Sequence, residues 1–392
     1  MTAIAAGRSG GYVRQPAGFR AFVPKPLPPT PPVEISNDLL AALSRADRAL
    51  GRLDGSTETL PNPDLFVLMY VRKEAVLSSQ IEGTQATLLD VLEFEVKGGH
   101  ADRTGDADEV LNYVNAMNYG LRRLKRLPVS SRLIREIHAK LMAGVRGGEK
   151  NPGEFRRSQN WVGPPGSTIS SASYVPPPVS EMQSALSDLE KFIHDPTPMA
   201  ALIKVGLVHS QFETIHPFLD GNGRVGRLLI TFMLCEREVL KRPLLYLSHY
   251  FKQNQREYYQ RLAAVHEEGD WEGWLLFFLQ GVAQVSNEAT ETARMIVNLR
   301  EQHRKLVGDR MKASQRALKL LENLFFNPIV PVAMVEKYTG LSFANANELV
   351  KRFVEMGLLR EITGKPRNRM FAYQPYLELF AERDTRAKSE RA

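Results

Sequence analysis

The sequence predicts a mainly α-helical protein with one small β-hairpin and a compact C-terminal domain. Apolar residues recur at helical spacing over most of the chain. Only residues 144–178 are rich in Gly, Pro and Ser, and they contain two short β-prone segments, Trp161-Val162 and Tyr174-Val175. A composition of 43% hydrophobic and 24% charged residues is that of a globular protein and argues against a disordered chain. The length of 392 residues accommodates two or three domains.

Helical patterns account for most of the remaining chain. Ser36 and Asn37 can cap a first helix, and Gly83 is expected to interrupt the second. The segments with helical spacing are 36–53, 63–97, 110–124, 130–143 and several between 180 and 304. Before them, six prolines between residues 24 and 32 predict an extended arm, because proline fixes φ and lacks an N–H. We interpret this arm as a strap over the domain surface rather than as an SH3-type ligand.

Bulk properties exclude several classes of protein. Cys235 is the single cysteine, so an intramolecular disulfide and a cysteine-only metal site are ruled out. The N-terminal residues lack the apolar run of a signal peptide, and no stretch of about 20 apolar residues predicts a membrane span. We therefore expect a cytoplasmic protein without a membrane partner. The net charge is +7.

The most informative segment is 216–227, which reads His-Pro-Phe-Leu-Asp-Gly-Asn-Gly-Arg-Val-Gly-Arg. Asn222 and Gly223 stand at the expected start of a helix, whose free N–H groups and positive dipole end suit a phosphate. The glycines let the backbone approach that anion closely. Arg224 and Arg227, three residues apart, can both reach it. This part of the segment predicts a phosphate cradle.

A metal ligand and a base lie in the same segment. Asp220 offers a hard oxygen to Mg²⁺, which usually keeps waters and phosphate oxygens as its other ligands. His216 is a candidate general base for a hydroxyl nucleophile. The three glycines also fit the dinucleotide fingerprint, but that motif needs a preceding strand, and residues 209–218 show no β alternation. Cradle, metal ligand and base together indicate phosphoryl or nucleotidyl transfer.

Residues 216–227 resemble the active-site motif of Fic proteins, His-x-Phe-x-Asp/Glu-Gly-Asn-Gly-Arg-x-x-Arg, at every fixed position. The resemblance implies an all-helical Fic core that transfers AMP from ATP to a hydroxyl side chain of a protein. His216 would deprotonate the target hydroxyl, and Asp220 would bind Mg²⁺. The residues implied for phosphate binding are Gly221, Asn222, Gly223, Arg224 and, for the γ-phosphate, Arg227.

A second motif, Ser78-Ser79-Gln80-Ile81-Glu82-Gly83, lies far upstream. Ser78 and Glu82 share one face of the expected helix, which taken alone indicates a solvated helix end. Beside the Fic motif it resembles that family's inhibitory helix, Ser/Thr-x-x-x-Glu-Gly/Asn. The resemblance implies that Glu82 pairs with Arg227 and keeps the γ-phosphate out of its productive place. A carboxylate on this arginine would also repel an incoming phosphate.

The expected hairpin resembles the flap with which Fic proteins hold a target segment as an added strand. Its candidate docking residues are Ser170, Ala172 and Tyr174, and a surface loop that merely covers the core is the alternative. Residues 153–156, Gly-Glu-Phe-Arg, also look family-like. So does His209, for which we expect a structural role.

Downstream polar and aromatic residues are candidates for an adenine and ribose pocket: Tyr250, Asn254 and Tyr258. Aromatic residues at such spacing suit a hydrophobic core equally well, and this alternative stays open.

The C-terminal segment predicts helices at 313–326, 332–338 and 342–355, then strands at 357–362 and 370–373. This order resembles a winged helix. From residue 311 onward the chain carries 14 Lys and Arg against 9 Asp and Glu. Three of these bases fall in the expected wing, namely Lys365, Arg367 and Arg369. DNA binding is one interpretation of this domain, and protein docking or dimerisation is the other.

We therefore expect four regions: an arm and helices including the inhibitory helix (1–105), the catalytic core (106–300), the winged helix (301–380) and a charged tail (381–392). The predicted function is that of a protein adenylyltransferase that uses ATP and Mg²⁺ and is autoinhibited by Glu82. Its acceptor would be Tyr, Thr or Ser of an unidentified protein or of the chain itself, and a homodimer is compatible with this. The alternatives are removal of AMP from a modified protein and a DNA-binding regulator with a secondary Fic activity.

Overall fold

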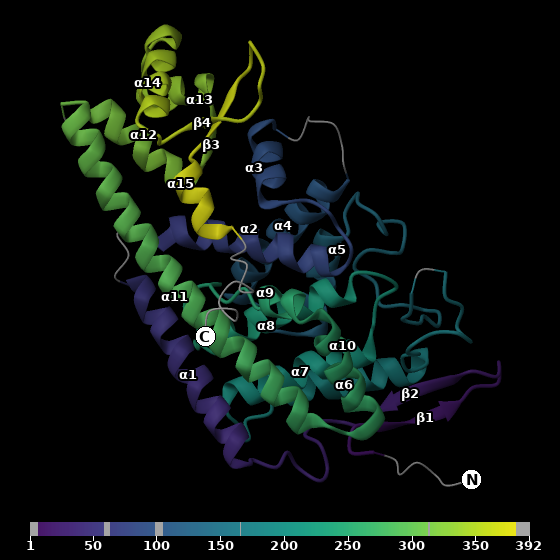
Figure 1. Ribbon diagram of the computed structural model, residues 1–392. Helices are drawn as coiled ribbons and strands as arrows, with labels where there is room; N and C mark the ends of the chain where they lie inside the picture. Colours follow the sequence, from purple (N-terminus) through teal and green to yellow (C-terminus); the bar gives the residue numbers. More distant parts are fainter. Residues whose placement is uncertain (1–6, 59–62, 99–104, 165, 313, 382–392) are drawn as a thin grey trace, which may run out of the picture. The chain divides into compact units, whose positions relative to one another are not determined.

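The computed structural model of the protein describes residues 7–58, 63–98, 105–164, 166–312 and 314–381 (Figure 1). The predicted fold class is confirmed, because the described residues are mainly helical with two small sheets. The chain forms two compact units: the first comprises 1–55, 70–86 and 103–287, and the second comprises 56–69, 87–102 and 288–392. The domain boundaries expected from the sequence stay predictions, and the tail after residue 381 lies outside the described residues.

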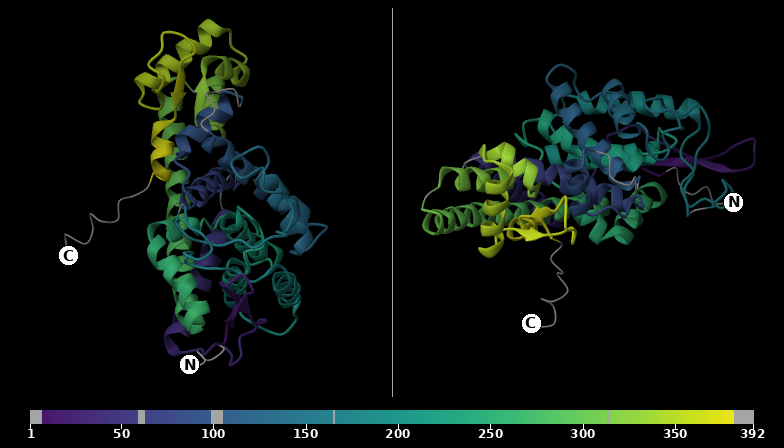
Figure 2. Two further views of the ribbon diagram at one scale, coloured as in Figure 1. Left: turned by 90° about the vertical axis from the view of Figure 1, so that its right-hand side faces the viewer. Right: turned by 90° about the horizontal axis from the view of Figure 1, so that it is seen from above.

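The first unit begins with a hairpin that the sequence reasoning missed. Strands β1 (Gly10–Arg14) and β2 (Arg20–Pro24) pair antiparallel, with Tyr12 opposite Phe22 (Figures 1 and 2). Phe22 is fully buried and its ring packs on the rings of Tyr12 and Tyr174. This burial fixes the hairpin on the helices below it.

The proline-rich arm follows the hairpin as an extended strap. Arg8 donates both to the backbone oxygens of Pro31 and Pro32 and to the carboxylate of Glu272. Glu34 N also donates to Glu272 Oε1, at 2.7 Å. Glu272 lies in the first turn of α11 (Trp271–Arg310), so the strap is tied to that helix.

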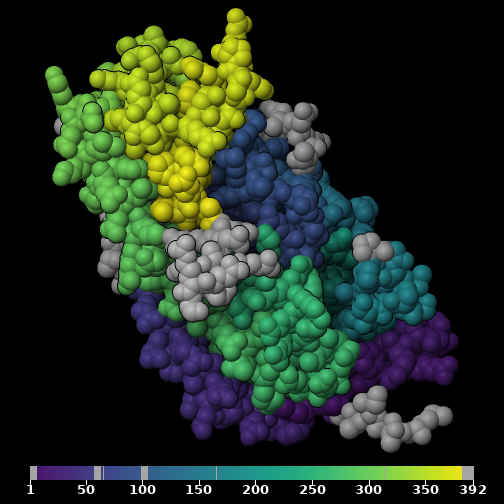
Figure 3. Space-filling view, in the orientation of Figure 1, coloured from purple at the N-terminus to yellow at the C-terminus, as the bar shows by residue number. Residues whose placement is uncertain are grey.

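Two nearly enclosed helices form the centre of the first unit, α7 (Ala201–Ile215) and α8 (Asn222–Glu236). Helix α8 packs against α7, α4 and α5. By contrast, α10 lies on the surface in Figure 3, since only its Tyr258 and Val265 are buried. The other helices of this region are α1 (Asn37–Glu58), α2 (Pro63–Ile81), α4 (Asp106–Leu124), α5 (Ser131–Leu141), α6 (Val179–His194), α9 (Ser248–Gln253) and α10 (Gln255–Glu268).

The second unit holds α3 (Leu88–Val96), which starts at a capping box between Thr87 and Asp90. Its C-terminal part contains helices and a three-stranded antiparallel sheet of order β3-β5-β4. These elements are α12 (Gln315–Phe326), β3 (Ile329–Pro331), α13 (Val332–Thr339), α14 (Phe343–Glu355), β4 (Arg360–Glu361), β5 (Met370–Ala372), α15 (Gln374–Leu377) and a 3₁₀ turn (Glu378–Phe380). The expected three helices and two strands are present, β3 was missed, and the winged-helix assignment stays a prediction.

Of two elements expected from the sequence, one is present as predicted and the other is shorter. The helical segment expected from 63 to 97 is interrupted at Gly83, as predicted, because the chain turns there with a φ of 97° and continues as a second helix. The expected hairpin around residues 161–175 is reduced to a single bridge between Val162 and Tyr174. Prolines at 164 and 176–178 lack the N–H groups that longer strands would need. No described helix is both long and apolar enough to cross a membrane.

Candidate active site

The loop between α7 and α8 carries the predicted motif, and its own side chains shape it. Helix α7 ends where His216 adopts a left-handed conformation, with φ of 49°. Asn222 then closes the loop: its Oδ1 accepts from Phe218 N at 2.8 Å and its Nδ2 donates to Phe218 O at 2.9 Å. Both ends of the Asn222 side-chain amide are occupied by these bonds. Asn222 would therefore contact a phosphate through its backbone N–H.

The start of α8 is open to an anion because glycines stand directly before its first residue and at its second, positions 221 and 223. A Cβ at residue 221 would lie 2.8 Å from Met142 Sδ, and a Cβ at residue 223 would overlap Glu82 Oε1. The N–H groups of the first turn have no acceptor four residues earlier in the helix, and the helix dipole is positive here. The geometry is that of an anion site whose entrance holds the Glu82 carboxylate.

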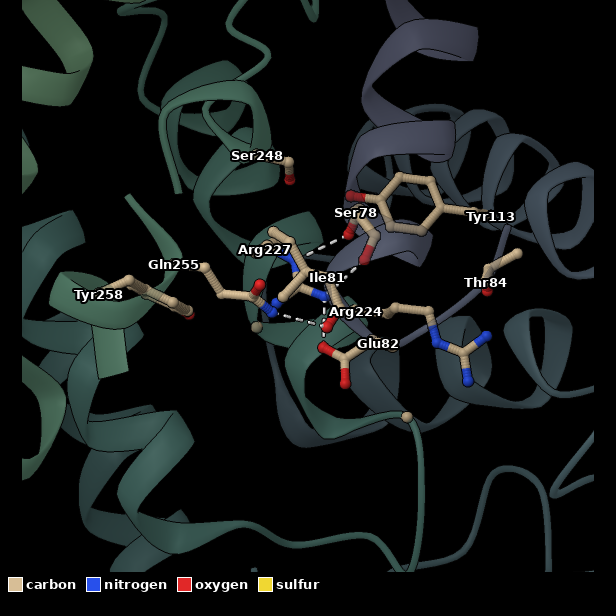
Figure 4. A network of polar contacts seen from close by, with 12 residues as sticks. Ser78, Ile81, Glu82, Thr84, Tyr113, Arg224, Arg227, Ser248, Gln255 and Tyr258 are labelled. Carbon is tan, nitrogen blue, oxygen red and sulfur yellow. Dashed lines mark hydrogen bonds and ion pairs between the residues drawn. The ribbon is translucent and has the colours of Figure 1, made fainter. Parts of the chain in front are cut away.

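Arg227 is the best-connected residue of the site (Figure 4). Its Nη2 donates to Glu82 Oε1 at 2.6 Å and to Ser78 O at 3.0 Å, while its Nε donates to Ser78 Oγ at 2.8 Å. Burial, the largest single cause, opposes the charge, but the neighbouring Glu82, Tyr258 and Glu213 together with the hydrogen bond to Glu82 outweigh it and raise the pKa of Arg227. The pairing of Glu82 with Arg227 that the sequence predicted is present, with Ser78 as the second anchor.

Arg224 points to the opposite side of the same helix start. Its Nη1 donates to Glu109 Oε2 at 3.3 Å, and its Nη2 lies 3.3 Å from Met142 Sδ and 3.9 Å from Asp220 Oδ1. Its Nε is buried without a hydrogen-bond partner among the described residues. These long and incomplete contacts leave donors of a buried guanidinium available to an anionic ligand.

His216 is held as a neutral base. Its Nδ1 faces Glu213 O at 3.3 Å, and since a carbonyl only accepts, the proton lies on Nδ1 and Nε2 keeps its lone pair. Burial is the main cause that lowers the pKa of His216 to about 4. At neutral pH the imidazole is therefore ready to accept a proton.

Asp220 meets the requirements of a magnesium ligand. Its Oδ1 accepts from Gly221 N at 2.7 Å, and its half-buried Oδ2 lies 3.0 Å from Lys150 Nζ. The described residues contain no group of three or more His, Cys, Asp or Glu suited to a metal. A half-buried carboxylate beside a phosphate cradle fits Mg²⁺, which takes its remaining ligands from water and phosphate.

Two segments of the chain, which together contain the residues of this site, match known protein families. Residues 40–122 match the Fic/DOC family N-terminal region, and residues 128–234, which contain the loop and α8, match the Fic/DOC family. The chain carries a Fic domain. The motif at the start of α8 and the helix that bears Glu82 both fall within these matched segments.

Curated relatives of the Fic domain are named protein adenylyltransferase Fic. The protein of Aedes aegypti is 34% identical over 166 residues, covering 42% of this chain and 29% of the relative. The protein of Drosophila erecta is 29% identical over 209 residues, covering 48% of this chain and 38% of the relative. The chain therefore spans less than two fifths of the length of these two relatives.

A solved structure confirms the Fic fold beyond the sequence matches. The crystal structure of a Fic family protein from Desulfovibrio desulfuricans G20 superposes with a TM-score of 0.56 at 18% identity. The superposition covers 87% of this chain and 97% of the Desulfovibrio chain.

The aromatic candidates for an adenine pocket lie in the core of the Fic domain. Tyr258 is 1% exposed, and its hydroxyl lies 2.9 Å from His209 Nε2, while His209 Nδ1 faces Gly226 O at 3.0 Å. Tyr250 is buried beside Phe277, and Asn254 Nδ2 donates to Tyr250 O. Burial lowers the pKa of His209 to about 3, so it is a neutral core residue, as expected. These positions agree with the core alternative, and a role in binding the base stays a prediction.

The candidate flap divides into an anchor and an exposed part. Tyr174 is buried, and its hydroxyl donates to Thr214 O at 2.7 Å, two residues before His216. Ser170 is exposed and Ala172 is half-buried, so both lie where a target segment could reach them. Docking of a target at these residues stays a prediction.

The sequence reasoning missed four charged residues that surround the site. Glu109 accepts from Thr84 and Arg224, and Arg156 donates to the carbonyl of His216. Glu74 is a buried acid and Glu213 a half-buried one, and desolvation raises the pKa of each to about 7. Two of the four left a signal in the sequence: Arg156 lies in the Gly-Glu-Phe-Arg segment, and Glu213 lies in the family-like segment that begins at His209.

Proposed function

We propose that this Fic domain transfers AMP from ATP to a hydroxyl side chain of a protein, and that Glu82 holds it in an inhibited state. The observation that carries the proposal is the position of the Glu82 carboxylate, bound to Arg227 and lying over Gly223 at the start of α8. A carboxylate placed there occupies an anion site. The curated relatives named protein adenylyltransferase support the reaction class.

In the transfer reaction, the acceptor oxygen attacks the α-phosphorus of ATP while its proton passes to His216 Nε2. The bond between the α-phosphorus and the bridging oxygen to the β-phosphate breaks, and pyrophosphate leaves. The backbone N–H groups of α8, Arg224 and Arg227 would stabilise the phosphate charge. Asp220 would hold Mg²⁺, which supplies further charge neutralisation at the phosphates.

The inhibitory contact joins a fixed residue to an accessible one. Arg227 is 2% exposed at its side chain and keeps two bonds to Ser78, whereas the Glu82 side chain is 32% exposed. Glu82 comes directly after the last residue of α2 and directly before Gly83. Withdrawal of the carboxylate would therefore free the arginine without displacing it, and the γ-phosphate could take its place.

The test is transfer of label from α-³²P ATP with Mg²⁺ to protein, measured for the parent chain, Glu82→Gly and Glu82→Gly/His216→Ala. We expect little label with the parent, strong label with Glu82→Gly on the chain itself or on proteins of a lysate, and none with the double variant. Gln85→Gly places a glycine at an exposed position of the same loop and controls for backbone loosening.

Two outcomes would overturn the proposal. If Glu82→Gly labels neither itself nor a lysate, transfer is not the reaction that Glu82 restrains. If Glu82 is instead required for release of AMP from a modified protein, the chain is a phosphodiesterase of the same linkage.

A further inference from the structure

Arg156 is a buried cation whose acceptors are all backbone carbonyls. It lies in the segment after α5 and is 2% exposed. Its Nε donates to His216 O at 3.1 Å, its Nη1 to Ser158 O at 3.2 Å and its Nη2 to Pro177 O at 2.5 Å. Its backbone N–H also donates to Pro217 O at 2.9 Å. No ion pair within the described parts of the chain includes this guanidinium.

Burying an arginine without a carboxylate is costly, so the contacts that compensate for it must be well placed. The guanidinium is planar and rigid, and here its N–H groups donate to two separate segments of the site. One is the carbonyl of His216. The other is the carbonyl of Pro177, three residues after the bridge between Tyr174 and Val162.

The carbonyl of His216 has a second donor. Asn160 Nδ2 lies 3.2 Å from His216 O and 2.8 Å from Phe218 O. His216 has a positive φ of 49°, a conformation that residues other than glycine seldom adopt and that surrounding contacts must hold. Arg156 and Asn160 together fix the peptide group that sets the direction of the imidazole.

The segment beside the bridge is fixed from the other side as well. Tyr174 donates its hydroxyl to Thr214 O at 2.7 Å, and Phe22 N donates to Val175 O at 2.9 Å. Arg156 thus closes a ring of contacts that runs from the end of α7 through this segment and back to His216.

We propose that Arg156 is a positioning residue that holds the carbonyl of His216 and the base of the flap in one geometry. His216 Nε2 then meets the acceptor hydroxyl that the flap presents. This inference rests on the proposed function, and it adds a residue outside the 216–227 motif to the machinery of transfer.

The charge of Arg156 also acts on the base. Besides burial, the charged groups that face His216 are Arg156, which lowers its pKa, and Glu82 and Asp220, which raise it. Removing Arg156 would raise the pKa of His216 toward its ordinary value. The acid limb of the transfer reaction would then move to higher pH.

The experiment uses the full chain in the Glu82→Gly background and measures the initial rate of label transfer from α-³²P ATP against ATP concentration and pH. We expect Arg156→Gln to lower the maximal rate about 100-fold, since small misplacements of reacting groups have such effects. The KM for ATP should change less than about threefold, because Arg156 contacts no residue of the phosphate cradle. Arg156→Lys should recover part of the rate, since an ammonium can still donate to one or two carbonyls.

Gln159→Ala is the matched control. Gln159 Nε2 donates to Pro176 O and Asn160 O and does not contact His216, so this variant should keep the rate and pH profile of Glu82→Gly. Asn160→Ala removes the second donor to His216 O together with the donor to Phe218 O, and it should slow transfer less than Arg156→Gln because the guanidinium still holds His216 O.

Different outcomes overturn different claims. If Glu82→Gly itself transfers no label, the proposed function fails. If Glu82→Gly transfers label and Arg156→Gln does so at the same rate and with the same pH profile, the role of Arg156 is wrong. If Arg156→Gln does not fold by circular dichroism, Asn160→Ala decides, and an unchanged rate and pH profile there overturns the inference.

Discussion

The Glu82 carboxylate lies directly against Gly223 at the start of α8. The carboxylate oxygen that binds Arg227 would clash with a Cβ on residue 223. The space that a glycine leaves open for an anion is therefore filled by an anion of the chain itself. This relationship makes the inhibited state of the proposed enzyme testable by stability as well as by activity.

Replacing Gly223 by alanine should change the unfolding free energy differently in the presence and in the absence of Glu82. In the parent chain, Gly223→Ala would push the carboxylate from Arg227, and we expect a lower unfolding free energy by about 1 kcal/mol. In Glu82→Gly the overlap with the carboxylate is absent and the Cβ meets Arg227 Nη1 at 3.0 Å, so the higher helix propensity of alanine should offset most of the remaining cost. Urea unfolding of the four chains measures the coupling, and additive effects would contradict the geometry.

Ser78→Ala should destabilise the protein, whereas the same substitution at the neighbouring Ser79 should not. The change leaves the buried Nε of Arg227 without its acceptor and should cost about 2 kcal/mol of unfolding free energy. Ser79 is equally buried, but its hydroxyl has no partner among the described residues, so Ser79→Ala should be neutral. Equal losses for both variants would show that the serine contact with Arg227 contributes nothing.

Glu213 should make the stability fall as the pH rises. Burial raises its pKa from 4.5 to about 7, so the folded state binds a proton more tightly than the unfolded state between these values. The resulting stability is full below about pH 4.5 and is lost through pH 7, at about 2 kcal/mol after allowance for partial exposure. Glu213→Gln should remove this slope.

Glu74 provides the contrast for that measurement. Its pKa is also raised to about 7, but it accepts hydrogen bonds from Tyr113 and Ser248. We therefore expect Glu74→Gln to flatten the pH dependence and also to lower stability at pH 5, where Glu213→Gln should not. A parent chain whose unfolding free energy stays flat between pH 4.5 and 8, after correction for other groups, would contradict both assignments.

DNA binding and protein docking, the two interpretations of the C-terminal region, predict different results in a salt titration. Phe343, at the start of α14, is 58% exposed, and Arg369 Nη2 donates to the Asn347 side chain on the same helix. Gel-shift titrations across salt with the full chain should show salt-sensitive binding, and Lys365→Ala and Arg367→Ala should each reduce the salt slope by about 1. Binding that is absent or insensitive to salt would favour the alternative of a protein-docking or dimerisation unit.

The elements that the sequence predicted well are those with a local signature. The turn at Gly83, the capped helix at residue 37 and the loop before α8 depend on residues adjacent in the chain. The pairing of Glu82 with Arg227 was accessible because both residues lie in dense motifs that resemble those of one family.

The missed features depend on contacts between distant segments. Strands β1 and β2 are five residues each, and they are stabilised by burial of Phe22 rather than by a distinctive turn. Glu109 accepts from Arg224 although it lies on another helix, and Arg156 donates to the carbonyl of His216, which is 60 residues away in the sequence. A backbone carbonyl is present at every residue, so the sequence carries no trace of which one an arginine will contact.

Because Glu82 and Arg227 belong to one chain, their encounter does not depend on how much protein is present. A tethered group acts at an effective concentration set by the chain that joins it to its site, commonly in the millimolar range for short flexible connections and independent of dilution. Free ATP must therefore compete for Arg227 with the Glu82 carboxylate at a constant effective concentration. The fraction of uninhibited molecules would then follow the nucleotide supply and the mobility of the end of α2, and lowering the amount of enzyme in the cell would leave it unchanged.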